Sequence, residues 1–351
     1  MNSFGRIFRV SIFGESHGTS VGCKIDGCPP GMPLTHGDFF VDIERRKPGA
    51  KGTTPRKEDD IPEIISGVFN DKTTGTPITI LFRNTNTRSS DYEKQRAVPR
   101  PGHADFVATK KFKGFEDYRG GGHFSGRLTV ALVAAGVIAK KVLNYQMGQK
   151  QALSSGDALG EIPFKSLETT PIKITSTILE VGGEKNIEEG LQKAINAKDS
   201  IGGIVECTVS GLPIGLGEPF FDSAESVISH LVFAIPAVRG IEFGTGFAAA
   251  KMFGSEHNDA LESMYGKTKT NHAGGIVGGL TNGNELVFRI AIKPTSSTPK
   301  EQQTLNIETG NVEPFSVKGR HDLCIALRVP VILEAVTAIA LVDLLLITKT
   351  Q

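Results

Sequence analysis

Short runs of β-branched and aromatic residues along the chain alternate with longer stretches in which apolar residues have helical spacing. The short runs predict strands at Phe8–Phe13, Ile78–Phe82, Ile172–Ile178, Ile204–Val209 and Leu286–Ile292. Apolar residues three and four positions apart predict helices at Gly37–Arg46, Thr129–Leu143, Ile187–Ala197, Ser223–Phe233 and Val331–Leu346. The sequence therefore predicts a mixed α and β protein.

Two segments, Lys47–Asp60 and Lys293–Lys318, are polar, charged and weakly periodic. They predict long loops, which in a compact domain are usually functional or disordered. No proline-rich linker divides the chain. We therefore expect a single domain over residues 1–351, with a layer of helices between sheets.

The composition narrows the class of protein. The chain has 351 residues, 39% of them hydrophobic, which is enough to bury a core. Its 39 basic and 38 acidic residues argue against a protein that coats nucleic acid. The amino terminus lacks the apolar core of a signal peptide, and charged residues and a proline interrupt the most apolar stretch, near Val329–Ile347. We expect a soluble, cytoplasmic protein that binds neither nucleic acid nor membranes.

The four cysteines are Cys23, Cys28, Cys207 and Cys324. Cys23 and Cys28 resemble half of a zinc site, but no second pair of Cys or His follows at ligand spacing. We expect buried, reduced thiols and no metal, because free cysteine behaves as a small hydrophobic residue.

Two histidine-containing loops are candidates for chemistry. Ser16-His17 lies between Gly14 and Gly18 directly after a predicted strand, where a ligand can approach, although an isolated Ser-His pair is more often a capping Ser beside a surface His. In Arg100-Pro101-Gly102-His103-Ala104-Asp105, a turn places His103 between a basic and an acidic residue. This arrangement is typical either of an imidazole whose pKa is set by its neighbours or of a loop histidine that only makes local hydrogen bonds.

Three further segments indicate anion binding. The Gly120–Gly122 run before the predicted helix at Thr129 offers free backbone N–H groups and a positive dipole end, with His123 and Arg127 close by. Lys293–Ser297 combines an ammonium group with hydroxyls. In Lys318–Cys324, Asp322 follows Arg320 and His321, as either a base with a tuned pKa or an ion-paired turn.

Together these segments describe a site for polyanionic ligands, with several groups that can move protons and with no obvious nucleophile or metal. The residues alone indicate an enzyme that eliminates or transfers groups on phosphorylated, carboxylated molecules.

At these residues the sequence resembles the chorismate synthase family, over essentially the whole chain. Eleven motifs match in order: FGESHG (Phe13–Gly18), DGCPPGMPL (Asp26–Leu34), RRKPG (Arg45–Gly49), SGVF (Ser66–Phe69), TTGTPI (Thr73–Ile78), RPGHAD (Arg100–Asp105), DYRGGG (Asp117–Gly122), GLGEPFFD (Gly215–Asp222), NHAGGIVGG (Asn271–Gly279), KPTSS (Lys293–Ser297) and GRHDLC (Gly319–Cys324).

The resemblance implies an α+β fold of the β-α-β sandwich type, a homotetramer, and a requirement for reduced FMN. The implied reaction is the anti-1,4-elimination of phosphate and the C6 hydrogen from 5-enolpyruvylshikimate 3-phosphate. The product is chorismate, and the step is the last of the shikimate pathway to aromatic amino acids. NADPH is implied only if the protein reduces its own flavin.

The resemblance also implies residue roles. His17 would protonate the departing phosphate, His103 would donate a proton towards the reduced flavin, and Asp322 would work with flavin N5 in taking the C6 proton. The implied substrate-binding residues are Ser16, Arg46, Lys51, Arg100, Arg127 and Arg320. The implied flavin-binding residues are His123, Phe124, Ser125, Pro236, Ala237, Gly278, Lys293, Pro294, Thr295, Ser296, Ser297 and Arg320.

The chain departs from the usual family pattern after the triple glycine. His123-Phe124-Ser125-Gly126-Arg127-Leu128-Thr129 stands where Arg-Ser-Ser-Ala-Arg-Glu-Thr is common. In the basic loop, Lys51 takes the place of a second arginine. The altered segment motivates an alternative, a flavin-binding reductase that lacks the elimination, although the sequence has no recognisable nicotinamide motif. A nucleic-acid module is a third hypothesis, and the balanced charge argues against it.

Overall fold

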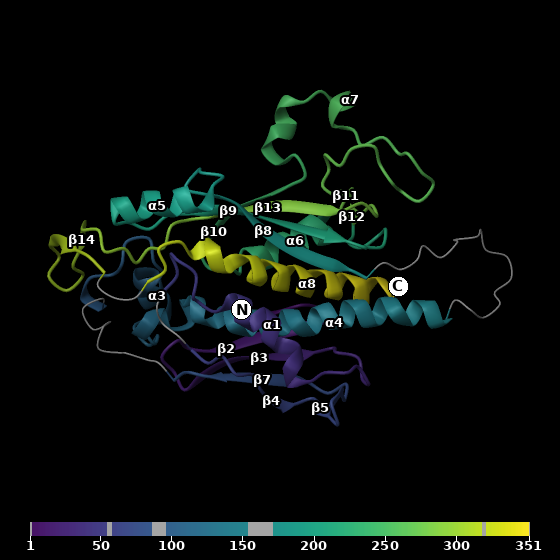
Figure 1. Ribbon diagram of the computed structural model, residues 1–351. Helices are drawn as coiled ribbons and strands as arrows, with labels where there is room; N and C mark the ends of the chain where they lie inside the picture. Colours follow the sequence, from purple (N-terminus) through teal and green to yellow (C-terminus); the bar gives the residue numbers. More distant parts are fainter. Residues whose placement is uncertain (1, 55–57, 86–95, 154–170, 318–320, 351) are drawn as a thin grey trace.

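The computed structural model describes residues 2–54, 58–85, 96–153, 171–317 and 321–350 and contains two larger antiparallel sheets (Figure 1). The first sheet has the order β1-β2-β3-β7-β4, with β1 Ser3–Phe4, β2 Arg9–Gly14, β3 Ser20–Asp26, β7 Ile78–Arg83 and β4 Glu63–Ser66. The second has the order β10-β13-β9-β8, with β10 Val238–Phe243, β13 Leu286–Ile292, β9 Gly203–Ser210 and β8 Lys173–Val181.

Two long helices, α4 (Thr129–Leu153) and α8 (Val329–Thr348), lie between these sheets in Figure 1. The helices contact each other, α4 also contacts β3 and β7, and α8 contacts β8 and β9. Gly136 permits the close approach of the helices, because a Cβ there would lie 2.3 Å from the Cβ of Ala335. Both helices begin at the same end of the molecule, so their N-terminal dipole ends lie on one side.

Both long helices are apolar enough to cross a membrane by length and composition, but 78% and 83% of their most apolar windows are buried inside the protein. This burial is typical of core helices. Two shorter helices lie beside them: α1 (Phe40–Arg46) contacts α4, and α6 (Ala224–Val232) contacts α8.

The remaining α-helices and strands of the described residues are short or peripheral. They are helices α3 (Asp105–Phe112), α5 (Ile187–Ala197) and α7 (Gly254–His257), and three hairpins formed by β5 (Val68–Phe69) with β6 (Lys72–Thr73), β11 (Ile276–Val277) with β12 (Leu280–Thr281), and β14 (Gln302–Leu305) with β15 (Val312–Phe315).

The predicted α+β class with antiparallel sheets is confirmed, and every predicted strand and helix is present within a few residues, except that α4 continues ten residues beyond the predicted end at Leu143. The prediction of a long loop at Lys293–Lys318 is wrong in part, because the β14–β15 hairpin lies within it. Its polar residues form a small exposed hairpin, whose cross-strand hydrogen bonds need no apolar pattern.

Most of the buried hydrophobic residues form one cluster that includes residues of both sheets and both long helices. All four cysteines are buried and free, as predicted. Burial raises the pKa of the Cys23, Cys28 and Cys207 thiols to about 12, so they are not thiolates at neutral pH. The assignment of residues 1–351 to a single domain stays a prediction.

Candidate active site

A cavity of about 660 Å³ lies where the loops before α4 and α8 meet. Most of the predicted site residues line it, although they come from loops far apart in the sequence. They are Arg46, Arg100, His103, His123, Phe124, Ser125, Arg127, Pro236, Ala237, Lys293, Pro294, Thr295, Ser296, Ser297 and Asp322. Because both helix N-termini face this region, their dipoles add positive potential for an anionic ligand.

His103 lies in a hydrogen-bonded group with Arg100 and Asp105. Its Nδ1 is 2.6 Å from Asp105 Oδ1, and Arg100 donates to the same carboxylate at 2.7 and 2.8 Å. Burial alone would raise the pKa of Asp105, but the hydrogen bonds from Arg100 and His103 outweigh it and hold that pKa far below its usual range. A carboxylate can only accept, so His103 Nδ1 carries a hydrogen and Nε2 is left for a ligand.

Arg46, Asp60 and Arg127 form a buried group that we call the cavity cluster. Asp60 is 6% exposed, accepts from Arg46 Nη2 at 2.9 Å and also pairs with Arg127. Burial would raise the pKa of Asp60, but the two guanidinium groups lower it; for Arg46, burial prevails and lowers the pKa to about 10. Two buried cations share one carboxylate, so the cluster keeps a positive charge at the cavity wall.

Asp322 is connected to the cavity cluster through Arg328. Its Oδ1 accepts from the backbone N–H of Thr54 at 2.8 Å, and its Oδ2 accepts from Arg328 at 3.2 Å. Arg328 Nε in turn donates to the carbonyl of Arg46 at 3.0 Å. Arg328 thereby fixes Asp322 relative to the cavity cluster.

The Gly120–Gly122 loop separates two of the predicted catalytic histidines. All three glycines have positive φ, between 52° and 80°, which other residues rarely adopt. A Cβ on Gly120 would lie 2.6 Å from His17 Nε2, and one on Gly121 would lie 3.4 Å from His103 Nε2. His17 is therefore behind Gly120 and next to the cavity, but it does not line the cavity as His103 does.

Ser16 is fully buried beside His17. Its Oγ has no hydrogen-bond partner among the described residues, and it would lie 3.0 Å from a Cβ on Gly120. The backbone N–H of Ser16 donates to the Gly122 carbonyl at 3.1 Å, which holds the glycine loop over both side chains.

The altered segment after the triple glycine has a defined geometry. His123 Nδ1 is 2.8 Å from the carbonyl of Gly14, which can only accept, so this nitrogen carries a hydrogen. The ring of Phe124 is 40% exposed and lies against Phe112 at 6.2 Å between centroids. Ser125 Oγ accepts from the Arg127 N–H at 3.3 Å and caps the turn before α4.

The Lys293–Ser297 loop joins the second sheet to the His103 loop. Lys293 donates to Ser296 Oγ at 2.7 Å, and Ser296 donates to the carbonyl of Gly102 at 2.8 Å. Arg100 Nη1 donates to Ser297 Oγ at 3.2 Å. Burial and the charge of Arg239 lower the pKa of Lys293.

Not every predicted residue reaches this cavity. Lys51 is exposed and Gly278 lies in the β11–β12 turn; neither lines the cavity, although the family resemblance implied both. Arg320 lies outside the described residues. Asp60 and Arg328 were not predicted as site residues, although Asp60 ends the predicted loop Lys47–Asp60 and Arg328 lies four positions after the GRHDLC motif.

The whole chain is similar to proteins of one family. A family model described as "Chorismate synthase" matches residues 8–346. A chorismate synthase of Chitinophaga pinensis is 67% identical over 99% of this chain and 98% of that protein. A chorismate synthase of Dehalococcoides mccartyi is 43% identical over 98% of this chain and 96% of that protein. One of Methanocaldococcus jannaschii is 42% identical over 99% of this chain and 96% of that protein.

A solved structure agrees with these sequences. The crystal structure of a chorismate synthase superposes with a TM-score of 0.68 at 25% identity, over 98% of this chain and 93% of that one. Similarity of this extent, together with the ordered motifs in the cavity loops, leads to one conclusion: the chain belongs to the chorismate synthase family.

Proposed function

We propose that this chain converts 5-enolpyruvylshikimate 3-phosphate to chorismate and inorganic phosphate, acting as a carbon–oxygen lyase with reduced FMN. One C–O bond to phosphate breaks and the C6 hydrogen leaves as a proton, so no net oxidation occurs. The observation that carries the proposal is that His103, Asp322 and four arginines line one cavity. The reductase alternative has no support from the relatives, which are chorismate synthases.

The substrate is a multiply charged anion, and the cavity wall is basic. Arg46, Arg100, Arg127, Arg328 and Lys293 line it, against the carboxylates of Glu58, Asp60 and Asp322. Guanidinium groups suit carboxylates and phosphates because their planar fork donates two parallel hydrogen bonds. The cavity cluster and Arg100 would hold these groups.

The residues present fit a flavin. Ile12, Leu231, Ala234, Pro236 and Ile339 give the cavity an apolar side, and the Lys293–Ser297 loop gives it a polar one. Thr295 Oγ1 is buried and has no hydrogen-bond partner among the described residues, as a group that waits for a ligand would be. His123–Ser125, Pro236–Ala237 and Lys293–Ser297 would hold the flavin. When bound, reduced FMN would supply electron density that helps phosphate leave.

The remaining chemistry is proton transfer by the protein. In its doubly protonated form, His103 would donate a proton from Nε2 towards the flavin, while Asp105 holds Nδ1 and Arg100 holds the Asp105 carboxylate. The Asp322 carboxylate, oriented by Thr54 and Arg328, would accept the C6 proton. His17 would act on the departing phosphate from behind Gly120, and Ser16 would bind close to it.

We also propose a cytoplasmic homotetramer that binds neither nucleic acid nor membranes and arranges its sheets and helices as a β-α-β sandwich. Self-association is supported by large exposed side chains around α7, where Phe247, Phe253 and Met264 are 84%, 77% and 99% exposed. Sedimentation velocity tests the oligomeric state; a monomer at micromolar concentration would contradict it.

The activity is tested with purified protein, 5-enolpyruvylshikimate 3-phosphate and FMN under anaerobic conditions. One reaction contains dithionite and the other contains NADPH alone. Phosphate release and chorismate absorbance with dithionite support the proposal; FMN binding without either product contradicts it. Turnover with NADPH alone would show that the protein reduces its own flavin, which the sequence leaves open.

A further inference from the structure

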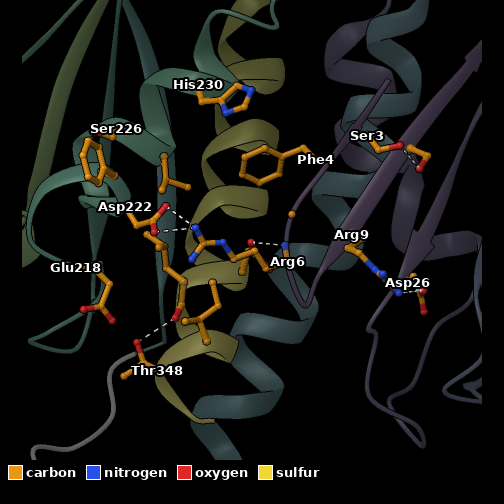
Figure 2. A pocket seen from close by; sticks show the side chains of 18 of the residues that line it. Ser3, Phe4, Arg6, Arg9, Asp26, Glu218, Asp222, Ser226, His230 and Thr348 are labelled. Atoms are coloured by element: carbon orange, nitrogen blue, oxygen red, sulfur yellow. Dashed lines mark hydrogen bonds and ion pairs between the residues drawn. The ribbon is translucent and has the colours of Figure 1, made fainter. Parts of the chain in front are cut away.

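A second cavity of about 620 Å³ lies between the N-terminal segment, α6 and the end of α8 (Figure 2). Arg6, Arg9 and Asp26 line one side of it, and Asp222 and Ser226 line the other. It contains none of the residues to which the proposed reaction assigns a role. The two cavities have part of their lining in common.

Three residues line both cavities: Ser3, Phe4 and His230. The rings of Phe4 and His230 meet edge to face, with centroids 5.4 Å apart and planes at 88°. Figure 2 shows the two rings next to each other. These two rings therefore form a partition between the cavities.

Hydrogen bonds to α8 fix the N-terminal side of this partition. The buried Asp343 carboxylate of α8 accepts from the backbone N–H groups of Arg6, Ile7 and Phe8 at 2.9, 2.8 and 2.8 Å. The Arg6 guanidinium also donates to both oxygens of Asp222, at 2.9 and 2.7 Å. These bonds hold the segment after Phe4 against α8 and against the loop before α6.

The α6 side of the partition continues into the proposed flavin site. Leu231 and Ala234 line the cavity beyond His230, and the predicted flavin contacts Pro236 and Ala237 follow directly. The partition thus lies at the apolar side of the cavity, where the isoalloxazine would be shielded from water. Closed sites of this kind prevent side reactions of a reactive bound group.

We propose that the Phe4–His230 pair shields bound reduced FMN from solvent and dioxygen that reach the second cavity, a proposal that rests on the flavin site above. In the side reaction that it prevents, dioxygen takes two electrons and two protons from reduced FMN and becomes hydrogen peroxide. The function of the pair is steric: an aromatic ring on each side closes the gap, and neither side chain takes part in the elimination.

The proposal is tested with the Phe4→Ala variant, which removes one ring. Iodide quenching of bound oxidised FMN fluorescence and stopped-flow oxidation of bound reduced FMN by dioxygen are both measured. We expect both rate constants to rise several-fold in Phe4→Ala. Phe221→Ala is the matched control, because Phe221 lines only the second cavity and is 94% exposed, so removal of its ring leaves the partition closed.

The other side of the partition gives an independent test. His230→Ala is expected to raise both rate constants as Phe4→Ala does, and His230→Phe, which keeps a ring, is expected to leave them at the wild-type level. Rate constants in Phe4→Ala and His230→Ala that equal those of Phe221→Ala would overturn the partition while the elimination activity stands. Failure of the wild-type protein to bind FMN would instead remove the proposed function.

Discussion

The adjacent arginines at the end of α1 belong to two ion clusters of opposite character, one partly exposed and the other buried. Arg45 donates to both oxygens of Glu334 at 2.7 Å, and Lys140 and Asp42 complete what we call the helix cluster. That cluster has two cations and two carboxylates. Arg46 belongs to the cavity cluster, in which two cations share Asp60. The helix cluster neutralises itself, whereas the cavity cluster is neutralised only by a further anion.

The pKa values of the two arginines reflect this difference. Hydrogen bonds to Glu334 raise the pKa of Arg45 above its usual value, and burial lowers that of Arg46 to about 10. A balanced cluster joins elements of the fold, here α1, α4, α8 and, through the Ser176 N–H at 3.1 Å, β8. An unbalanced one at a cavity wall indicates an anion site. The two clusters should therefore respond differently to substitution.

The largest effect is expected at the proton-transfer group beside the cavity cluster. His103→Ala should lower kcat by roughly 10²–10⁴-fold, the range for removal of a positioned acid or base. Stability should change little, because His103 is partly exposed in a loop. Stopped-flow chorismate absorbance measures the rate, and thermal unfolding is the control. Wild-type turnover would remove His103 from the mechanism.

Substitution in the helix cluster should have the opposite effect: it should lower stability and leave kcat unchanged. Glu334→Gln should lower the free energy of unfolding by about 3 kcal/mol, the low end for breaking a buried ion pair, because Arg45 is 42% exposed and keeps Asp42. Urea unfolding measures this loss. The kcat of the folded fraction should stay at the wild-type value; a fall in kcat without a loss of stability would reverse the contrast between the clusters.

Substitution of the neighbouring arginines sharpens the comparison further. Arg46→Lys should raise KM by roughly tenfold, since it removes the bidentate fork while it keeps the charge. Arg45→Lys is the matched control one position away and should leave KM unchanged. Steady-state kinetics with saturating reduced FMN measure both. Equal KM values in the two variants would show that the cavity cluster does not bind substrate.

The smallest effect concerns acid stability. The folded pKa of Asp60 is lowered, so its contribution to stability is present above its ordinary pKa of about 3.9 and is lost as the pH falls through the lower folded value. Asp60→Asn should remove this part of the acid dependence. Urea unfolding of both proteins from pH 6 to pH 2 tests it, and a constant difference in stability over that range would contradict it.

The sequence predicted the apolar elements well and the polar ones poorly. β13 and α5 have the predicted bounds because buried apolar residues recur along them with a clear strand or helix period. β3, a central strand of the first sheet, was missed. A glycine interrupts its pattern at residue 22, where a Cβ would lie 2.3 Å from the carbonyl oxygen of Ile80 and 2.7 Å from the ring of Phe13. Because close packing requires glycine at this position, the run of β-branched and aromatic residues that would have predicted the strand is interrupted.

The residues of the site could also be predicted from the sequence only in part. Motifs located the loops that reach the cavity, because glycines, arginines and histidines cluster in them. Local sequence does not contain the pairing of Asp60 with Arg46 and Arg127, which joins residues 14 and 67 positions apart. The same limit applies to Arg328, whose partners are the distant Arg46 carbonyl and Asp322. Only the folded chain shows which charges remain unbalanced.

Asp343 has a consequence for the order of events during synthesis. Its carboxylate accepts from the N–H of Phe8, which lies 335 positions earlier in the chain, so the segment around Phe8 cannot be held in place until α8 has been synthesised. Contacts at such sequence separation form slowly, because a long loop must close first. A nascent chain that lacks α8 would therefore expose the apolar face of its second sheet, which α8 contacts through β8 and β9, and chaperone dependence should end when that helix emerges.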